Sequence, residues 1–335
     1  MRITQELLLK LTHNEINKRL RQNPDLVAIY LAGSVLTGDP LLGGSTDIDL
    51  VFVHKEDPPV SREVARISYE ISLDIVHHHQ SLYTYHRQLR LNPWLGPSLC
   101  THASILHDSD HWLEFIQSSV SAQFDRPENV YGRAQPFAEK SRAIWFDLQD
   151  LESPNLSAWL PHYLKAIEMA ANALATLGGP ALTTRRFILQ LTPRLELLNK
   201  GALFNRFLVL IGADKLSQAA CTTWSQTWSE AIIAASKLKG CPPDLHSARR
   251  AYYLQSCNAM LEGGEYQAAI WPMITTWSQA ISVLKDDKKY LDDWLSFCEL
   301  LGFQADRFED CVSGLDSFLD EVEITLEAWK NNYGL

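Results

Sequence analysis

The chain has 335 residues, enough for about two domains of ordinary size. Apolar residues make up 46% of the sequence and charged residues 21%, a balance that excludes a disordered chain and predicts a soluble globular protein. The net charge of -10 excludes the basic excess that is typical of nucleic-acid-binding proteins. It favours cationic small molecules as partners, since an acidic surface attracts them.

The sequence shows no sign of membrane insertion or export. No run reaches the ~18 apolar residues that a membrane span needs, and the apolar run near the N-terminus, at 7–9, is too short for a signal peptide. The six cysteines lack the C-x-x-C spacing of metal or redox motifs. We therefore expect a cytoplasmic protein with reduced thiols and no membrane partner.

The first part of the chain alternates between strand-like and helix-like segments. Short apolar runs that end at glycine, proline or acidic turns predict buried strands. The expected elements are a helix over 14–21 with Thr12 or Asn14 as its N-cap, strands over 27–32, 46–53, 71–77 and 99–106, a helix over 61–70, and a helix that begins near Asp110.

After Phe124 the strand patterns stop and apolar residues recur three and four positions apart, which predicts helices. These are expected over 128–148, 157–177, 185–198, 227–238, 245–261, 266–284, 290–301 and 315–329. The repeated TTWSQ at 222–226 and 275–279 is interpreted as two helix beginnings. The predicted division is an N-terminal domain over 1–125 and an all-helical domain over 126–335.

The strand over 46–53 carries two carboxylates, Asp47 and Asp49, in an otherwise apolar run. Residues two apart in a strand point to the same face, so the two charges lie together. Adjacent like charges are costly in such a setting unless a cation neutralises them. A pair of carboxylates in this position favours an Mg²⁺ site, because Mg²⁺ prefers oxygen ligands.

Two further features add to this pattern. Asp74 lies on the strand over 71–77, on the face opposite its apolar residues, and reaches the same site if the two strands are neighbours. Gly33 and Ser34 end the first strand, where a glycine lets the backbone approach a phosphate and a serine hydroxyl donates to it. Three carboxylates at one place are typical of sites that hold divalent metal ions for phosphoryl-type transfer.

Gly33-Ser34, Asp47-Ile48-Asp49 and Asp74 resemble the DNA polymerase β-like nucleotidyltransferase superfamily, and 166–187 has a mild similarity to the helical domains of aminoglycoside nucleotidyltransferases. The resemblance implies an α+β fold, with a mixed sheet and helices followed by a helical acceptor domain. It also implies an Mg²⁺-dependent enzyme that transfers a nucleoside monophosphate, most often AMP from ATP, to a small-molecule hydroxyl.

Other residues are candidates for supporting roles. Arg185 and Arg186 are candidates for binding the triphosphate, the alternative being a solvated pair on a helix. Glu168, in an apolar helix, is a candidate base for the acceptor hydroxyl, as is Asp74; a surface salt bridge is the alternative for Glu168. The histidines over 77–79 alternate between strand faces and are interpreted as structural.

Three functions remain open at this point. The first is transfer of the nucleotide to a small molecule, such as an aminoglycoside-like cation, which the acidic net charge favours. The second is modification of a protein or tRNA, as by antitoxin-type nucleotidyltransferases. The third is a nucleotide-binding protein without catalysis, which would be signalled by a missing carboxylate; all three are present here.

Overall fold

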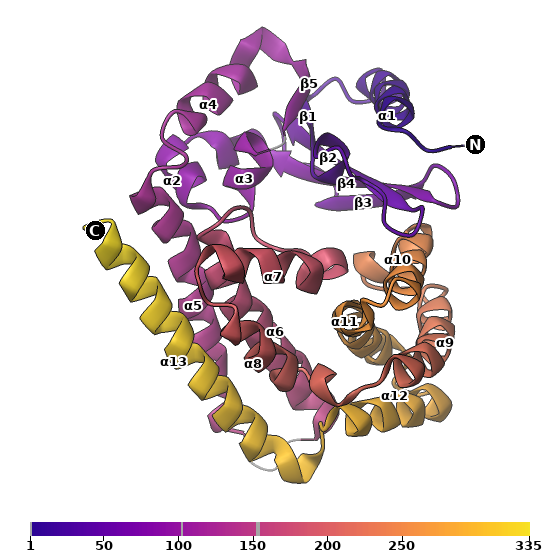
Figure 1. Cartoon of the computed structure of the whole chain (residues 1–335). Helices are drawn as coiled ribbons and strands as arrows, with labels where there is room; N and C mark the ends of the chain where they lie inside the picture. The colour runs from indigo at the N-terminus through magenta and orange to yellow at the C-terminus, as the bar shows by residue number, and fades with distance from the viewer. Residues whose placement is uncertain (1, 102, 152–154) are drawn as a thin grey trace. The chain divides into compact units, whose positions relative to one another are not determined.

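The computed structural model describes residues 2–101, 103–151 and 155–335 (Figure 1). Their contacts define two compact units. Unit 1 comprises Met1–Asn129 together with His246–Ser256, and unit 2 comprises Val130–Leu245 and Cys257–Leu335. Unit 1 thus includes a segment from late in the chain, which the sequence pattern placed among the helices of the second domain.

Unit 1 is built on a five-stranded mixed sheet with the order β3-β4-β2-β1-β5. The parallel pair is β2 with β4, and the remaining pairs are antiparallel. The strands are β1 (Leu26–Ala32), β2 (Thr46–His54), β3 (Arg62–Arg66), β4 (Ile71–His79) and β5 (Ser104–Asp108). With the helical region that follows, this confirms the predicted α+β class.

One face of the sheet packs against helix α1 (Gln5–Leu20). Alternate residues of the central strands, such as Leu50 and Leu73, form one buried cluster with Leu8 and Ile16 of α1. The period of two in the strands and the helical spacing in α1 are what bring these apolar side chains together.

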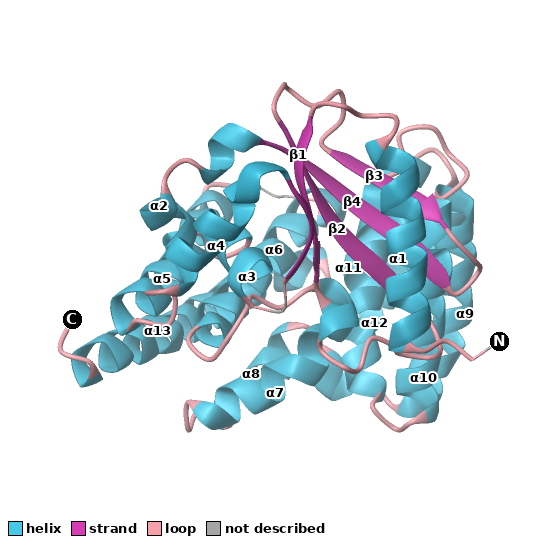
Figure 2. Cartoon of the chain, turned by 90° about the horizontal axis from the view of Figure 1, so that it is seen from above, coloured by secondary structure: helices cyan, strands magenta, loops and turns pink. Residues whose placement is uncertain are grey.

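The opposite face of the sheet packs against α2 (His86–Leu91), α3 (Leu95–Cys100) and α4 (Trp112–Ser121). Figure 2 shows α1 on one side of the sheet and these three helices on the other. The buried side chains of this face include Tyr30 and Val51. Toward the N-terminal ends of β2 and β4 this same face carries acidic residues instead of apolar ones.

Three predictions for unit 1 need correction. The expected helix over 61–70 is instead the edge strand β3, because its pairing with β4 overrides a charged sequence that is also compatible with a helix. Helix α1 begins at Gln5, where the Thr4 side chain accepts from the Leu7 amide, and not near Thr12. The fourth predicted strand lies later, as β5, because pairing with β1 sets its register.

From residue 127 onward the chain is helical, as predicted. The helices are α5 (Pro127–Gln149), α6 (Leu156–Thr176), α7 (Phe187–Leu197), α8 (Ala202–Leu210), α9 (Gln218–Ala235), α10 (Arg250–Glu262), α11 (Tyr266–Leu284), α12 (Lys288–Leu301) and α13 (Phe308–Asn332). The sequence pattern missed α8. Within the described ranges, no helix combines the length and the hydrophobicity needed to cross a membrane.

The repeated TTWSQ does not begin either helix. Helix α9 starts at Gln218 with Ser217 as its cap, so the first copy lies inside it, and the second copy lies inside α11. The hydroxyls of Thr222 and Thr223 donate to carbonyls four residues earlier, which is how threonine is accommodated within a helix. The two copies pack together, since Trp228 Nε1, just after the first copy, donates to Thr276 Oγ1 at 2.9 Å.

A buried polar chain links three side chains on the α2–α4 face of the sheet. The hydroxyls of Tyr30 and Tyr83 lie 3.1 Å apart, and the Tyr83 hydroxyl lies 2.8 Å from His78 Nδ1. Burial, followed by the neighbouring His77, lowers the pKa of His78 to about 4. His78 is therefore neutral near pH 7, and its ring shares a hydrogen bond with the Tyr83 hydroxyl.

This depressed pKa predicts a pH-dependent stability. The unfolded chain binds a proton at about pH 6.5 that the folded His78 does not bind until about pH 4, so stability is lost as the pH falls through that window. Between pH 7.5 and pH 5 the loss is about 2 kcal/mol. His78→Gln should remove about that much of the pH dependence of the free energy of unfolding, measured with urea. Replacement of the exposed His13 is the control, and a His78→Gln protein with the wild-type pH dependence would contradict the assignment.

Candidate active site

Three carboxylates meet on the α2–α4 face of the sheet. Asp47 and Asp49 lie on β2 and Asp74 on the adjacent parallel strand β4, with Asp49 directly opposite Asp74 in the register. One oxygen from each carboxylate lies within 4.8 Å of the other two. The condition for Asp74 to reach the other two carboxylates, that its strand neighbours theirs, is therefore met. We call Asp47, Asp49 and Asp74 the acidic triad.

Two of the three carboxylates are removed from solvent and Asp49 is half-buried, which makes the charge of the triad costly. Asp47 is 3% exposed and Asp74 is 5% exposed. Burial is the largest influence on Asp49 and raises its pKa well above the ordinary value, and the charges of Asp47 and Asp74 raise it further. The positive charges of Arg249 and Arg62 act in the opposite direction.

Arg62 forms a bidentate pair with Asp74. From the edge strand β3, its Nε donates to Asp74 Oδ1 at 2.8 Å and its Nη2 to Oδ2 at 2.6 Å. Sequence reasoning missed this residue because it placed 61–70 in a helix. The observed strand pairing sets Arg62 beside β4 and thereby within reach of the triad.

Arg249 is the second cation at the triad, and it comes from far along the chain. Its Nη1 donates to Asp74 Oδ2 at 2.8 Å and its Nη2 to Asp47 Oδ2 at 3.1 Å. The side chain is 7% exposed. Burial by itself would lower the pKa of Arg249, but the surrounding groups, among them Asp47 and Asp74, raise it well above its usual range. Arg249 is therefore a charged group that no local sequence signal indicated.

The segment that carries Arg249, His246–Ser256, makes several contacts within unit 1. The Arg66 guanidinium donates to the Ser247 carbonyl, and a Cβ at Gly43 would overlap the Gln255 carbonyl. The Arg249 guanidinium lies 4.8 Å from the ring centre of Tyr252, within cation–π range. We call His246–Ser256 the arginine segment.

Gly33 packs directly against the triad. It has φ +78°, and a Cβ at this position would clash with Asp49 Oδ2. Both features require glycine. Ser34 follows at the start of the short 3-10 helix η1 (Ser34–Leu36) and is half-buried. The structure thus places Gly33 against Asp49, with Ser34 next to it in the chain.

The donor set fits a divalent metal ion. Three carboxylates offer oxygens within the reach of one ion, and such hard ligands suit Mg²⁺. Ser72, opposite Asp47 in the register and on the same face, has a buried hydroxyl without a hydrogen-bond partner among the described residues. This hydroxyl is suited to a metal-bound water. The two arginines contact oxygens of the same carboxylates, so they compete with the ion for the triad.

The other predicted site residues belong to unit 2. Glu168, on α6, accepts from Lys165 at 3.0 Å, an ion pair within one helix turn. Arg185 and Arg186 lie in the 3-10 helix η4 (Thr184–Arg186), and Arg185 is buried, which does not match a solvated pair. Unit 1, which contains the triad, contains none of these three residues, and their roles stay predictions.

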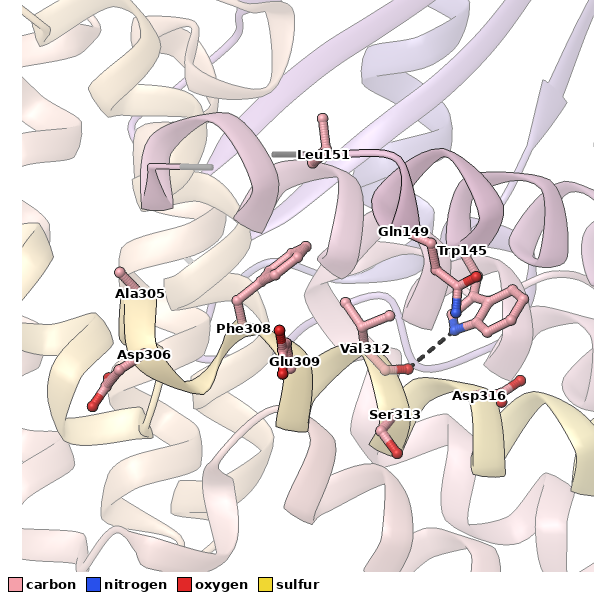
Figure 3. A pocket seen from close by; sticks show the side chains of 10 residues that line it. All are labelled: Trp145, Gln149, Leu151, Ala305, Asp306, Phe308, Glu309, Val312, Ser313 and Asp316. Atoms are coloured by element: carbon pink, nitrogen blue, oxygen red, sulfur yellow. Dashed lines mark hydrogen bonds between the residues drawn. The ribbon is translucent and has the colours of Figure 1, made fainter. Parts of the chain in front are cut away.

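A separate cavity of about 890 Å³ lies in unit 2, near the end of α5 and the beginning of α13 (Figure 3). Its lining includes Trp145, Phe308 and Asp316, and Trp145 Nε1 donates to the Val312 carbonyl. None of the predicted site residues lines it. The cavity therefore offers no support for the predicted chemistry.

Comparisons with known proteins give little information on identity. No model of a known protein family matches the chain, and no curated protein matches it. Among solved structures, the chain is similar to a nucleotidyltransferase-like protein from Exiguobacterium sibiricum 255-15. The identity is 14% and the TM-score 0.34, over 88% of this chain and 92% of that one. A similarity this distant leaves function to be judged from the site itself.

The contact between Gly33 and Asp49 can be tested with a matched pair of variants. Gly33→Ala adds a methyl group that displaces Asp49, and it also strains a backbone of positive φ. Gly38→Ala also places a side chain at positive φ, +85°, but meets nothing within 4 Å. We expect Gly38→Ala to cost about 1 kcal/mol of unfolding free energy and Gly33→Ala at least about twice as much. Urea unfolding measures both, and equal losses would contradict the close packing of Gly33 on the triad.

Proposed function

We propose that the protein is an Mg²⁺-dependent nucleotidyltransferase that moves AMP from ATP, or another nucleoside monophosphate from its triphosphate, to a hydroxyl of a small molecule. The observation that carries this proposal is the buried acidic triad on two adjacent parallel strands, with Gly33 packed against it. Buried carboxylates at this density are costly and are typical of sites that hold metal ions and phosphates.

In the proposed reaction, the acceptor oxygen forms a bond to the α-phosphorus of ATP and the bond to pyrophosphate breaks. Asp47, Asp49 and Asp74 would hold the ion, which supplies neutralisation of the phosphate charge when bound. Gly33 lets the end of β1 lie against Asp49, and the Ser34 hydroxyl is the proposed donor to phosphate oxygens. Arg185 and Arg186 remain candidates for further phosphate contacts.

The hydroxyl proton of the acceptor needs a base. Asp74 is one candidate, and in this structure both arginines donate to its oxygens. Glu168, from the helical unit, is the other candidate.

A cationic small molecule is the proposed acceptor. The net charge of -10 attracts cations and repels polyanions such as RNA. A second candidate function, nucleotide binding without catalysis, is favoured by one observation. Arg62 and Arg249 pair with two of the three carboxylates, so charges of the chain itself offset part of the charge of the triad.

The proposed reaction predicts the behaviour of triad variants. Asp47→Asn or Asp49→Asn removes a metal ligand, so transfer of label from α-labelled ATP should fall by at least about 100-fold. The fold should persist, which circular dichroism would confirm. Asp57→Asn, an exposed carboxylate on the loop after β2, is the matched control and should retain wild-type transfer. Full activity of either triad variant would refute the mechanism.

The acceptor class is identified by where the label goes. Incubation of the full chain with Mg²⁺, α-labelled ATP and separate panels of aminoglycosides, tRNA and cellular proteins should label an aminoglycoside. Binding of that acceptor should weaken as salt rises, because charge attraction is screened over about 8 Å at physiological ionic strength. Label on tRNA or protein would show that the acceptor is a macromolecule and that the proposed small-molecule acceptor is wrong. ATP binding without label transfer to any of them would favour the non-catalytic candidate.

A further inference from the structure

The arginine segment brings a positive charge into the acidic triad from outside the sheet. Arg249 bridges Asp47 and Asp74 with one guanidinium group, at 3.1 and 2.8 Å. Arg249, Asp47 and Asp74 have side chains only 7%, 4% and 6% exposed. Such a bridge is strong because it is charge-assisted and shielded from water. It occupies the oxygens that a metal ion would need.

A divalent ion and the docked Arg249 are poorly compatible at these carboxylates. An Mg²⁺ ion binds carboxylate oxygens at about 2.1 Å, and the guanidinium nitrogens already lie about 3 Å from oxygens of the same two carboxylates. Two cations at such short range repel each other strongly where water does not screen them. Binding of one therefore weakens binding of the other.

The two arginines differ in how firmly the fold holds them. Arg62 belongs to β3, and its main chain pairs with β4 beside Asp74. Arg249 belongs to a segment that forms no strand pairing with the sheet. This segment contacts the rest of unit 1 through the guanidinium bridge, the Arg66 contact to Ser247, the packing of Gly43 on Gln255 and the contacts of Ser247–Arg249 with β3 and β4, none of which is a strand pairing. It can therefore withdraw without breaking the sheet, whereas Arg62 cannot.

We propose that Arg249 is an exchangeable internal cation, which closes the acidic triad in the metal-free protein and is displaced when a divalent ion binds. The arginine segment then acts as an autoinhibitory contact that opens with metal loading. This inference rests on the proposed function, because it takes the triad to be a metal site. It also explains how a triad suited to catalysis can carry two arginines in the same structure.

The first test compares the metal affinity of variants, with Mn²⁺ as the probe and the full chain as the protein. Arg249→Met removes the competing charge while keeping much of the side-chain volume, so it should bind Mn²⁺ at least about tenfold more tightly than wild type. Arg250→Met is the matched control, since the neighbouring Arg250 is only half-buried and should leave the affinity unchanged. Paramagnetic resonance of free Mn²⁺ measures both, and circular dichroism verifies folding.

The second test separates displacement of Arg249 from a simple change in local charge, and it uses the wild-type protein alone. Hydrogen exchange of the amides over 247–253 should become several-fold faster with saturating Mn²⁺, while amides of β2 and β4 are unchanged or slower. If Mn²⁺ binds and exchange over 247–253 is unchanged or slower, Arg249 stays docked and the inference is wrong while the metal site stands. If neither wild type nor Arg249→Met binds Mn²⁺, both the inference and the proposed metal-dependent function are wrong.

Discussion

The burial of three like charges on one face of a sheet is the constraint on which the rest of unit 1 depends. A single buried carboxylate without a partner is already costly, and three within 4.8 Å also repel one another. Burial, and then the charges of its two neighbours, raise the pKa of Asp49, as this cost requires. Such an arrangement persists only if cations neutralise it, whether these come from the chain or from solution.

The residues around the triad either make room for its carboxylates or neutralise their charge. Gly33 is the residue that lets the end of β1 lie against Asp49, because any side chain there would displace the carboxylate. The edge strand β3 supplies Arg62, and the arginine segment supplies Arg249. The opposite face of the same strands is apolar and packs on α1, so the sheet stays anchored while one face carries the charges.

The sequence predicted the local parts of this arrangement and missed the distant ones. The alternation in β2 and β4 revealed the positions of Asp47, Asp49 and Asp74, because a period of two assigns each residue to a face without further information. Arg62 was missed because a short charged segment is compatible with both helix and strand, and pairing with β4 decides the outcome. Arg249 was missed because no local pattern relates it to carboxylates that lie about 200 positions earlier in the chain.

The charges at the triad decide between the two functions that the site allows. Three carboxylates and two guanidinium groups leave one negative charge, so the closed site is nearly neutral and needs no metal ion to be stable. If Arg249 were fixed, this neutrality would be permanent and the triad would be a structural ion network. If Arg249 leaves, the carboxylates keep more negative charge than Arg62 alone can neutralise. Carboxylates in that condition bind Mg²⁺ together with ATP. The proposed catalytic function therefore requires both the triad and an Arg249 that can leave it.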